Sequence, residues 1–101
     1  MRREAGEWSQ CAENYGALTL HHLSCGKLRP TVAYVRKLLF VTEGASSPEE
    51  RLNACLLAAT VYVAVHQVTP ARNHAVEAAG IAAHIGDAKG LVEAEQRFAQ
   101  I

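Results

Sequence analysis

Residues 47–88 decide the fold, and they read SPEERLNACLLAATVYVAVHQVTPARNHAVEAAGIAAHIGDA. The stretch opens with Ser47 and Pro48, a typical helix start, because serine caps the first turn and proline tolerates the first helical position. Glu50 lies three residues after the serine and can return a hydrogen bond, as in a capping box. Apolar residues then recur at helical spacing, which predicts a helix that continues to about Gln67.

The second half of this stretch contains similar signals for the start and end of a helix. Thr69-Pro70 again combines a capping residue with proline, and the apolar pattern continues to Ile85. Gly86 can adopt the left-handed conformation that ends a helix, and Asp87 can cap the helix that follows. We therefore expect a helix up to Ile85 and a shorter one after it, over about 87–100.

Two more helices are predicted upstream. The first runs from about Glu7 to Cys25, because apolar residues recur there every three or four positions. This stripe consists of Trp8, Cys11, Tyr15, Leu18 and His22. The second begins at about Pro30 and ends at about Glu43, before a short stretch of glycine, alanine and serine. No segment has the alternating pattern of a strand, so the expected fold class is all-α with antiparallel neighbours.

The composition fits a small helical domain. Half of the 101 residues are apolar, 18 are alanine, and ten Lys and Arg balance ten Asp and Glu. A disordered tail or a polybasic nucleic-acid arm would have fewer apolar residues and a charge excess, so both classes are excluded. Alanine at facing positions lets two helices approach closely, which predicts tight helical hairpins.

Several features favour a cytoplasmic location. The charged N-terminus is followed by no apolar run of the kind found in signal peptides. The longest apolar run, from Ala54 to Val65, is too short for a membrane span and is expected to be a buried helix. Cys11, Cys25 and Cys55 are odd in number and lack paired spacing, so we expect reduced, buried thiols.

The chain also contains a weak internal repeat of about 40 residues. A shift of this size aligns Leu28-Arg29-Pro30 with Val68-Thr69-Pro70, and it aligns Leu18 with Ala58. The matching features are the bend, the proline and the apolar stripe rather than residue identities. A fixed period of this length is typical of helix-pair solenoids, in which each unit buries its apolar face against its neighbours.

The junction at residues 75–90, AVEAAGIAAHIGDAKG, carries a family resemblance. Small residues along a helix, then Gly-Asp, then another glycine resemble the junction of long tetratricopeptide repeats, the variety common in bacterial regulators. In the first unit, an aromatic, a leucine, the turn glycine and a following apolar residue occupy the places that such repeats give them. These are Tyr15, Leu18, Gly26 and Leu28. The second unit has Cys55, Ala58 and His66 at the first three of these places.

This resemblance implies a single domain over residues 1–101. It implies two helix pairs, at about 7–43 and 47–86, and a terminal helix at 87–100, arranged as a tetratricopeptide-like superhelix. In such proteins the first helix of each pair lines a concave groove that holds a peptide. The groove positions carried over by register are Glu13, Ala17, Leu20, Leu23, Asn53, Leu57, Thr60 and Ala64.

The groove positions favour an apolar partner. The clamp that some tetratricopeptide proteins use for terminal carboxylates needs Lys, Arg and Asn, and only Asn53 matches. Leu20, Leu23 and Leu57 suit an amphipathic helix or an apolar peptide segment, although leucines at such positions can equally be core. We expect an interaction scaffold, an adaptor or a chaperone, that resembles the compact repeat chaperones of bacterial secretion systems. The alternative is a regulatory sensor domain that binds a peptide or a small molecule.

The short length also suggests association. A solenoid of two and a half units leaves its end faces uncovered, so we expect another protein or a second copy, as a homodimer, to cover them. Residues 1–42 carry six basic and three acidic side chains, and residues 43–101 carry four and seven, so the halves have net charges of +3 and −3. Lys27, Arg29, Arg36 and Lys37 form a basic zone. It has no aromatic residue except Tyr34, so nucleic-acid binding is not favoured.

Catalytic or metal-binding chemistry has little support. His21 or His22 could share a helix face with Cys25, but this gives two ligands where zinc needs three or four. The sequence contains no nucleophile elbow, glycine-rich loop or acidic pair. We therefore expect neither an enzyme nor a cofactor, and a metal protein or enzyme that uses His21, His22 and Cys25 is the least favoured alternative.

Overall fold

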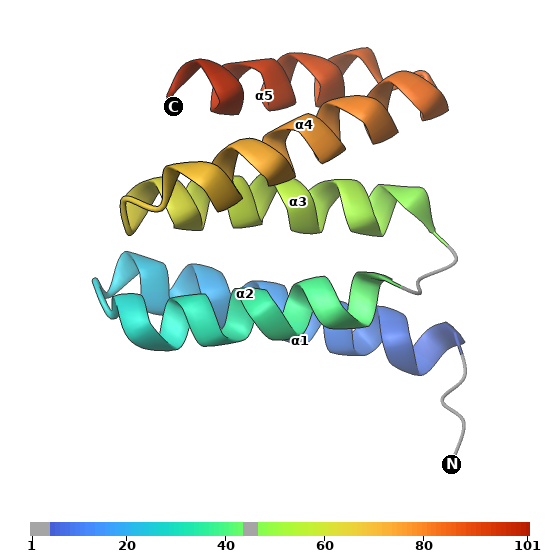
Figure 1. Cartoon of the computed structure of the whole chain (residues 1–101). Helices are drawn as coiled ribbons and strands as arrows, with labels where there is room; N and C mark the ends of the chain where they lie inside the picture. Colours follow the sequence, from blue (N-terminus) through green and yellow to red (C-terminus); the bar gives the residue numbers. More distant parts are fainter. Residues whose placement is uncertain (1–4, 44–46) are drawn as a thin grey trace.

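The computed structural model describes the backbone of residues 5–43 and 47–101 and, within these ranges, the side chains of residue 11 and of residue 13 onward. Helices account for almost all of the described chain, which contains no strand (Figure 1). They are α1 (Ala5–Ser24), α2 (Leu28–Glu43), α3 (Pro48–Ala64), α4 (Val68–Ile85) and α5 (Ala88–Ala99). The predicted all-α fold class and the five helices are confirmed.

Local sequence explains how most of these helices begin and end. Gly86 ends α4 in the left-handed conformation (φ 73°), and the Asp87 side chain caps α5 by accepting a hydrogen bond from the Gly90 amide (2.9 Å). Both agree with the prediction. Ser47 is the N-cap of α3, but its side chain makes no capping hydrogen bond, because its hydroxyl donates to the Glu49 carboxylate (3.0 Å).

The junction between α3 and α4 differs from the prediction. The third helix ends at Ala64 rather than at about Gln67, and the fourth begins at Val68, so Thr69-Pro70 lies inside its first turn. A proline is tolerated there because the first amides of a helix have no partner within it. The N-cap is Gln67, whose side chain makes no capping bond.

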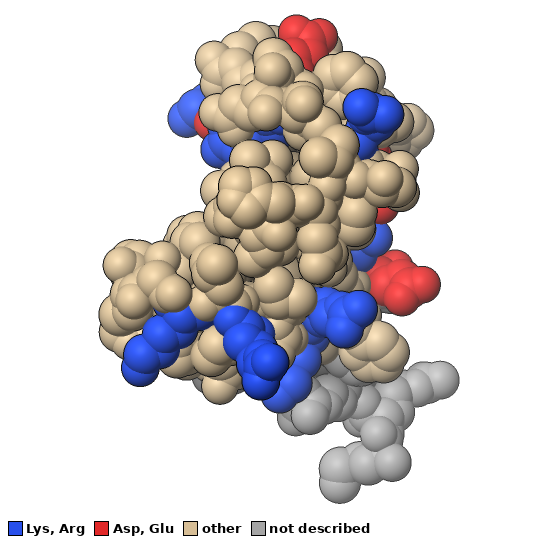
Figure 2. Space-filling view, turned by 60° about the vertical axis from the view of Figure 1, so that its left-hand side comes forward, with Lys and Arg blue, Asp and Glu red and all other residues tan. Residues whose placement is uncertain are grey.

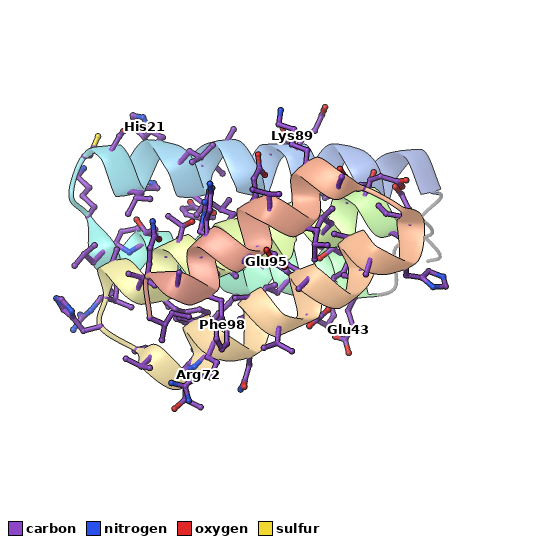
Figure 3. All side chains as sticks on the ribbon, turned by 90° about the horizontal axis from the view of Figure 1, so that it is seen from above. His21, Glu43, Arg72, Lys89, Glu95 and Phe98 are labelled. Atoms are coloured by element: carbon purple, nitrogen blue, oxygen red, sulfur yellow. The ribbon has the colours of Figure 1, made fainter. Side chains whose placement is uncertain are left out.

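Successive helices pack as antiparallel neighbours, as the short connections predict. Figure 1 shows α1 and α2 in the lower part of the molecule, α3 and α4 above them, and α5 at the top. His21 near the C-terminal end of α1 and Glu43 at the C-terminal end of α2 lie toward opposite ends of the molecule (Figure 3), so these two helices run antiparallel. In addition, α3 contacts both α1 and α5, so these three helices follow one another along one side of the stack.

Alanine makes up much of the core. The stripe of α4 that faces inward consists of Ala71, Ala75, Ala78 and Ala82, all fully buried. Such small side chains let the helix backbones approach closely. Larger residues of α3 fill the remaining space, Leu52 and Leu56 on the side of α5 and Val61 and Tyr62 on the side of α2.

The same left-handed turn follows α1 and α3, 40 residues apart, and it also follows α4. After α1, the Lys27 amide donates to the His22 carbonyl at 2.9 Å. After α3, the Gln67 amide donates to the Tyr62 carbonyl at 2.8 Å. After α4, the Asp87 amide makes the same bond to the Ala82 carbonyl at 2.9 Å, so this turn ends helices at both positions of a pair.

A ring pair recurs at the same spacing. His22 on α1 stacks on Tyr34 of α2, with ring centroids 5.3 Å apart and planes 3° apart. Tyr62 on α3 stacks on His74 of α4, at 5.7 Å and 10°. The two residue types have exchanged places between the pairs. In both, the histidine Nδ1 is buried and has no hydrogen-bond partner. The two helix pairs therefore share one stacked contact between their helices.

Candidate binding groove

A groove of about 430 Å³ lies between α1 and α3. One wall comes from a single face of α1, at spacings of three and four residues, and the opposite wall from a single face of α3. Leu38 of α2 also lines the groove. The lining residues are Glu13, Gly16 and Leu20 of α1, Leu38, and Glu50, Asn53, Ala54 and Leu57 of α3.

Four of the eight predicted groove residues meet here, namely Glu13, Leu20, Asn53 and Leu57. Leu20 is the most open apolar member, with 56% of its surface exposed. Leu57 is half-buried and packs against the core of α2 and α3.

The other four predicted residues lie outside the lining. Ala17 and Ala64 are exposed on α1 and α3, and Leu23 packs into the core beside Val35 and Tyr62. The Thr60 hydroxyl is hydrogen-bonded to α5, because Arg97 Nε donates to its Oγ1 at 2.9 Å. The lining residues that the sequence did not indicate are Gly16, Leu38, Glu50 and Ala54. Three of them neighbour a predicted residue at helical spacing, which is the signal that could have found them.

The chemistry of the groove is apolar and acidic. Three leucines supply most of its apolar surface, whereas the carboxylates of Glu13 and Glu50 and the amide of Asn53 contribute polar groups. No lysine or arginine is among the lining residues. The groove therefore presents an apolar surface with acidic groups and no basic ones among its lining residues.

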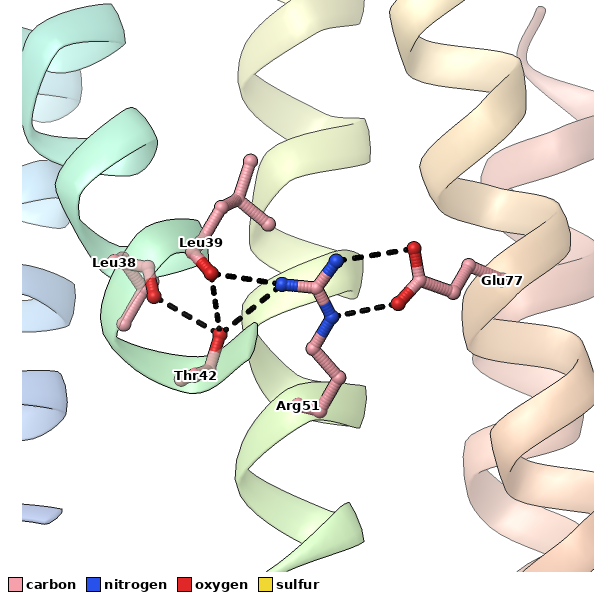
Figure 4. Close-up of polar contacts among 5 residues, drawn as sticks. All are labelled: Leu38, Leu39, Thr42, Arg51 and Glu77. Atoms are coloured by element: carbon pink, nitrogen blue, oxygen red, sulfur yellow. Dashed lines mark hydrogen bonds and ion pairs between the residues drawn. The ribbon is translucent and has the colours of Figure 1, made fainter. Parts of the chain in front are cut away.

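Arg51 holds the helices behind this groove in place. Its guanidinium donates to both carboxylate oxygens of Glu77 on α4, with Nε at 2.6 Å from Oε2 and an Nη at 3.1 Å from Oε1 (Figure 4). The other Nη donates to the Leu39 carbonyl at 2.8 Å and to Thr42 Oγ1 at 3.4 Å, both on α2. One side chain of α3 thus connects α2 and α4.

Burial and the hydrogen bonds of Arg51 shift the pKa values of three neighbouring groups. The hydrogen bond from Arg51 lowers the pKa of Glu77 below its ordinary value. Burial lowers the pKa of His74, and Glu77 acts in the opposite direction. Burial also raises the pKa of the Cys55 thiol to about 12. At neutral pH the thiol is therefore protonated and the imidazole neutral.

Cys55, His74 and Glu77 are the set of metal-ligand types that the described residues bring together, with ligand atoms within 4.8 Å of one another. A metal ion would have to displace the Arg51 guanidinium from Glu77 and the proton from the thiol. The carboxylate of Glu77 is already paired with Arg51, and the Cys55 thiol holds its proton at neutral pH. Both observations fit a structural network better than a metal centre.

Of the residues in the least favoured, metal-binding alternative, His21 and Cys25 lie together, whereas His22 makes a different contact. The sulfur of Cys25, just after the end of α1, lies 4.0 Å from Nε2 of His21 in the last turn of that helix. His22 instead stacks on Tyr34. Cys25 is exposed, which corrects the expectation that all three thiols are buried; Cys55 is buried and Cys11 half-buried.

Within the described ranges, no helix combines the length and the apolar character that a membrane crossing requires. Comparisons of the chain with family models, with curated proteins and with solved structures find no match.

Proposed function

We propose that this chain is a tetratricopeptide-like scaffold, an adaptor or a chaperone, that binds another protein in the groove between α1 and α3. The support for the repeat type is the recurrence of one stacked ring pair at a spacing of about 40 residues. The resemblance at residues 75–90 points to the same repeat. In such repeats the first helix of each pair lines the binding surface, and here these helices are α1 and α3.

The observation that carries the proposal is the exposure of Leu20 inside a concave surface. A leucine that is 56% exposed beside half-buried Leu57 leaves apolar area that a partner can cover. The exposed Glu13, which lines the same groove, favours a partner with a basic residue. The occupant that fits best is an amphipathic helix whose apolar face is flanked by Lys or Arg.

Site-specific photo-cross-linking in the native host tests this proposal. A benzophenone amino acid at Ala17, exposed on α1 beside the groove, is compared with the same probe at Ala83, exposed on α4. We expect a discrete cross-linked protein from position 17 that is absent from position 83 and lost when Leu20 is changed to Glu. The same cross-links from both positions, or cross-links that persist with the changed leucine, would contradict the proposal.

A regulatory sensor domain is the second candidate. The groove volume of about 430 Å³ lies within the range of small-molecule sites. Mass spectrometry of the protein purified under native conditions separates the two functions, because a sensor retains a stoichiometric small molecule and an adaptor retains a protein.

A further inference from the structure

A second groove, of about 510 Å³, lies on another part of the molecule, between the first half of α2 and the turn that joins α3 to α4. Its apolar surface comes from Leu28, Val32 and Val65, and its polar groups come from Arg29, Arg36 and His66. No carboxylate is among its lining residues. It therefore has the opposite charge to the groove between α1 and α3.

The two arginines of this second groove are available to a ligand. They are seven residues apart on α2, so they project from the same face of the helix. In the part of the chain that the structure describes, neither forms an ion pair, in contrast to Arg51. Figure 2, in which the left-hand end of Figure 1 comes forward, shows several basic groups on the lower part of the molecule.

His66 occupies a position at which the fold otherwise uses glycine. Gly26 after α1 and Gly86 after α4 have φ of 74° and 73°, and His66 after α3 has φ of 62°. A side chain in this left-handed conformation is strained, whereas glycine adopts it freely. The chain keeps a histidine here at a cost in stability, and its imidazole lines the second groove. Strain at a residue that lines a groove is typical of a binding role.

We propose that the second groove binds a peptide segment that carries a carboxylate beside an apolar side chain. The carboxylate lies against Arg29 and Arg36, which can form paired hydrogen bonds to it, and the His66 ring adds one N–H donor. The apolar side chain covers Val32 and Val65. A free phosphate would leave these apolar surfaces bare, and a nucleic acid would lack an aromatic platform, since no aromatic residue other than His66 lines the groove.

This proposal does not depend on the first groove, because the two share no lining residue. Amide chemical shifts of the ¹⁵N-labelled protein, titrated with acetyl-Glu-Leu-Glu-amide, test it. We expect shifts at residues 28–36 and 65–66 that saturate at millimolar peptide, as a short ligand requires. The matched acetyl-Gln-Leu-Gln-amide should leave them unchanged, and changing both Arg29 and Arg36 to Gln should weaken binding at least tenfold.

His66→Gly separates a binding role from a structural one. Because glycine relieves the strain, we expect the melting temperature to rise by about 4 °C or more, while affinity for the Glu-Leu-Glu peptide falls several-fold. A stabilised variant that binds like the wild type would overturn the role of His66.

Three further outcomes would overturn the proposal as a whole. These are equal binding of the Gln-Leu-Gln peptide, shifts that map outside the second groove, and saturation by inorganic phosphate or phosphatidylserine vesicles in preference to the Glu-Leu-Glu peptide. Arg72→Gln, which changes an exposed arginine of α4 outside the groove, should bind as the wild type does.

Discussion

The imidazole of His74 lies parallel to the ring of Tyr62, with centroids 5.7 Å apart, and its Nδ1 is buried without a hydrogen-bond partner. The equivalent pair in the first half of the chain, His22 and Tyr34, has the same arrangement with the residue types exchanged. The stacked rings therefore join the first helix of each pair to the second. A titratable group in one of these pairs couples the stability of the fold to pH.

We predict that the protein loses stability as the pH falls below the ordinary pKa of histidine, 6.5. Burial lowers the pKa of His74, so the folded chain holds the neutral ring while the unfolded chain takes up a proton. Stability that is fully present above pH 6.5 is thus lost as the pH falls toward the lower folded pKa. Urea unfolding at several values between about pH 7 and pH 5 measures this slope.

His74→Phe provides the control for this effect. Phenylalanine keeps the stacking on Tyr62 and removes both the titrating group and the buried Nδ1 without a partner. We expect the variant to be at least as stable at pH 7 and to have a shallower slope between pH 7 and pH 5. An unchanged slope would assign the pH dependence to another group.

The ion pair between Arg51 and Glu77 gives a second prediction. Arg51→Lys keeps the charge but loses the planar fork that reaches Glu77, Leu39 and Thr42 together. We expect a loss of about 1–3 kcal/mol in the free energy of unfolding, measured by urea denaturation. Arg72→Lys, at an exposed position of α4, should change it by less than about 0.5 kcal/mol. Equal effects at the two sites would count against the Arg51 network.

Two helical glycines are predicted to respond in opposite directions. A Cβ at Gly90 would lie 2.9 Å from Leu52 Cδ2 and 2.8 Å from the Asp87 carboxylate, whereas a Cβ at Gly80 meets nothing within 4 Å. Gly90→Ala should destabilise the fold by about 1–3 kcal/mol, because the buried Leu52 side chain and the capping Asp87 carboxylate must shift to make room. Gly80→Ala should stabilise it by about 0.5–1 kcal/mol. Thermal unfolding measures both, and a Gly90→Ala variant as stable as the wild type would contradict the tight contact with Leu52 and Asp87.

Thiol reactivity tests the packing between α3 and α4. Cys55 is fully buried with a pKa of about 12, so at pH 8 only about one thiol in ten thousand is ionised. In a Cys11→Ser background, Ellman's reagent should react quickly with exposed Cys25 and with Cys55 only after unfolding. Two rapidly reacting thiols in the folded protein would contradict the buried position of Cys55.

The sequence was sufficient for the helices but not for the details of their junctions. Apolar periodicity and the signals at Pro48, Gly86 and Asp87 are local, so they indicate helix ends without knowledge of the fold. Thr69-Pro70 misled the prediction because the turn at His66 closes α3 early, and the backbone of Gln67 then opens α4. A left-handed histidine carries no sequence signal comparable to glycine.

The candidate groove was predicted only in part, because its lining depends on the packing of α1 against α3, which helical spacing does not define. Register alone placed Leu23 and Thr60 in the groove. In the structure Leu23 faces the core and Thr60 accepts a hydrogen bond from Arg97, 37 residues away. The network of Arg51 and Glu77 likewise joins residues 26 positions apart. Such non-local pairs cannot be inferred from helical spacing.

The central claim is that the groove between α1 and α3 binds a partner protein, and a matched pair of variants tests it most directly. Leu20 lies in this groove and Val76 on the exposed side of α4, with exposed fractions of 56% and 57%. Changing either to Glu places one new charge on a helix surface at little cost to folding.

The decisive measurement is the affinity of these two variants for the partner that cross-links from position 17, determined by isothermal titration calorimetry. We predict that Leu20→Glu weakens binding by tenfold or more, whereas Val76→Glu binds as tightly as the wild type. Equal affinities for Leu20→Glu and the wild type, with the helical circular dichroism of both intact, would contradict the claim.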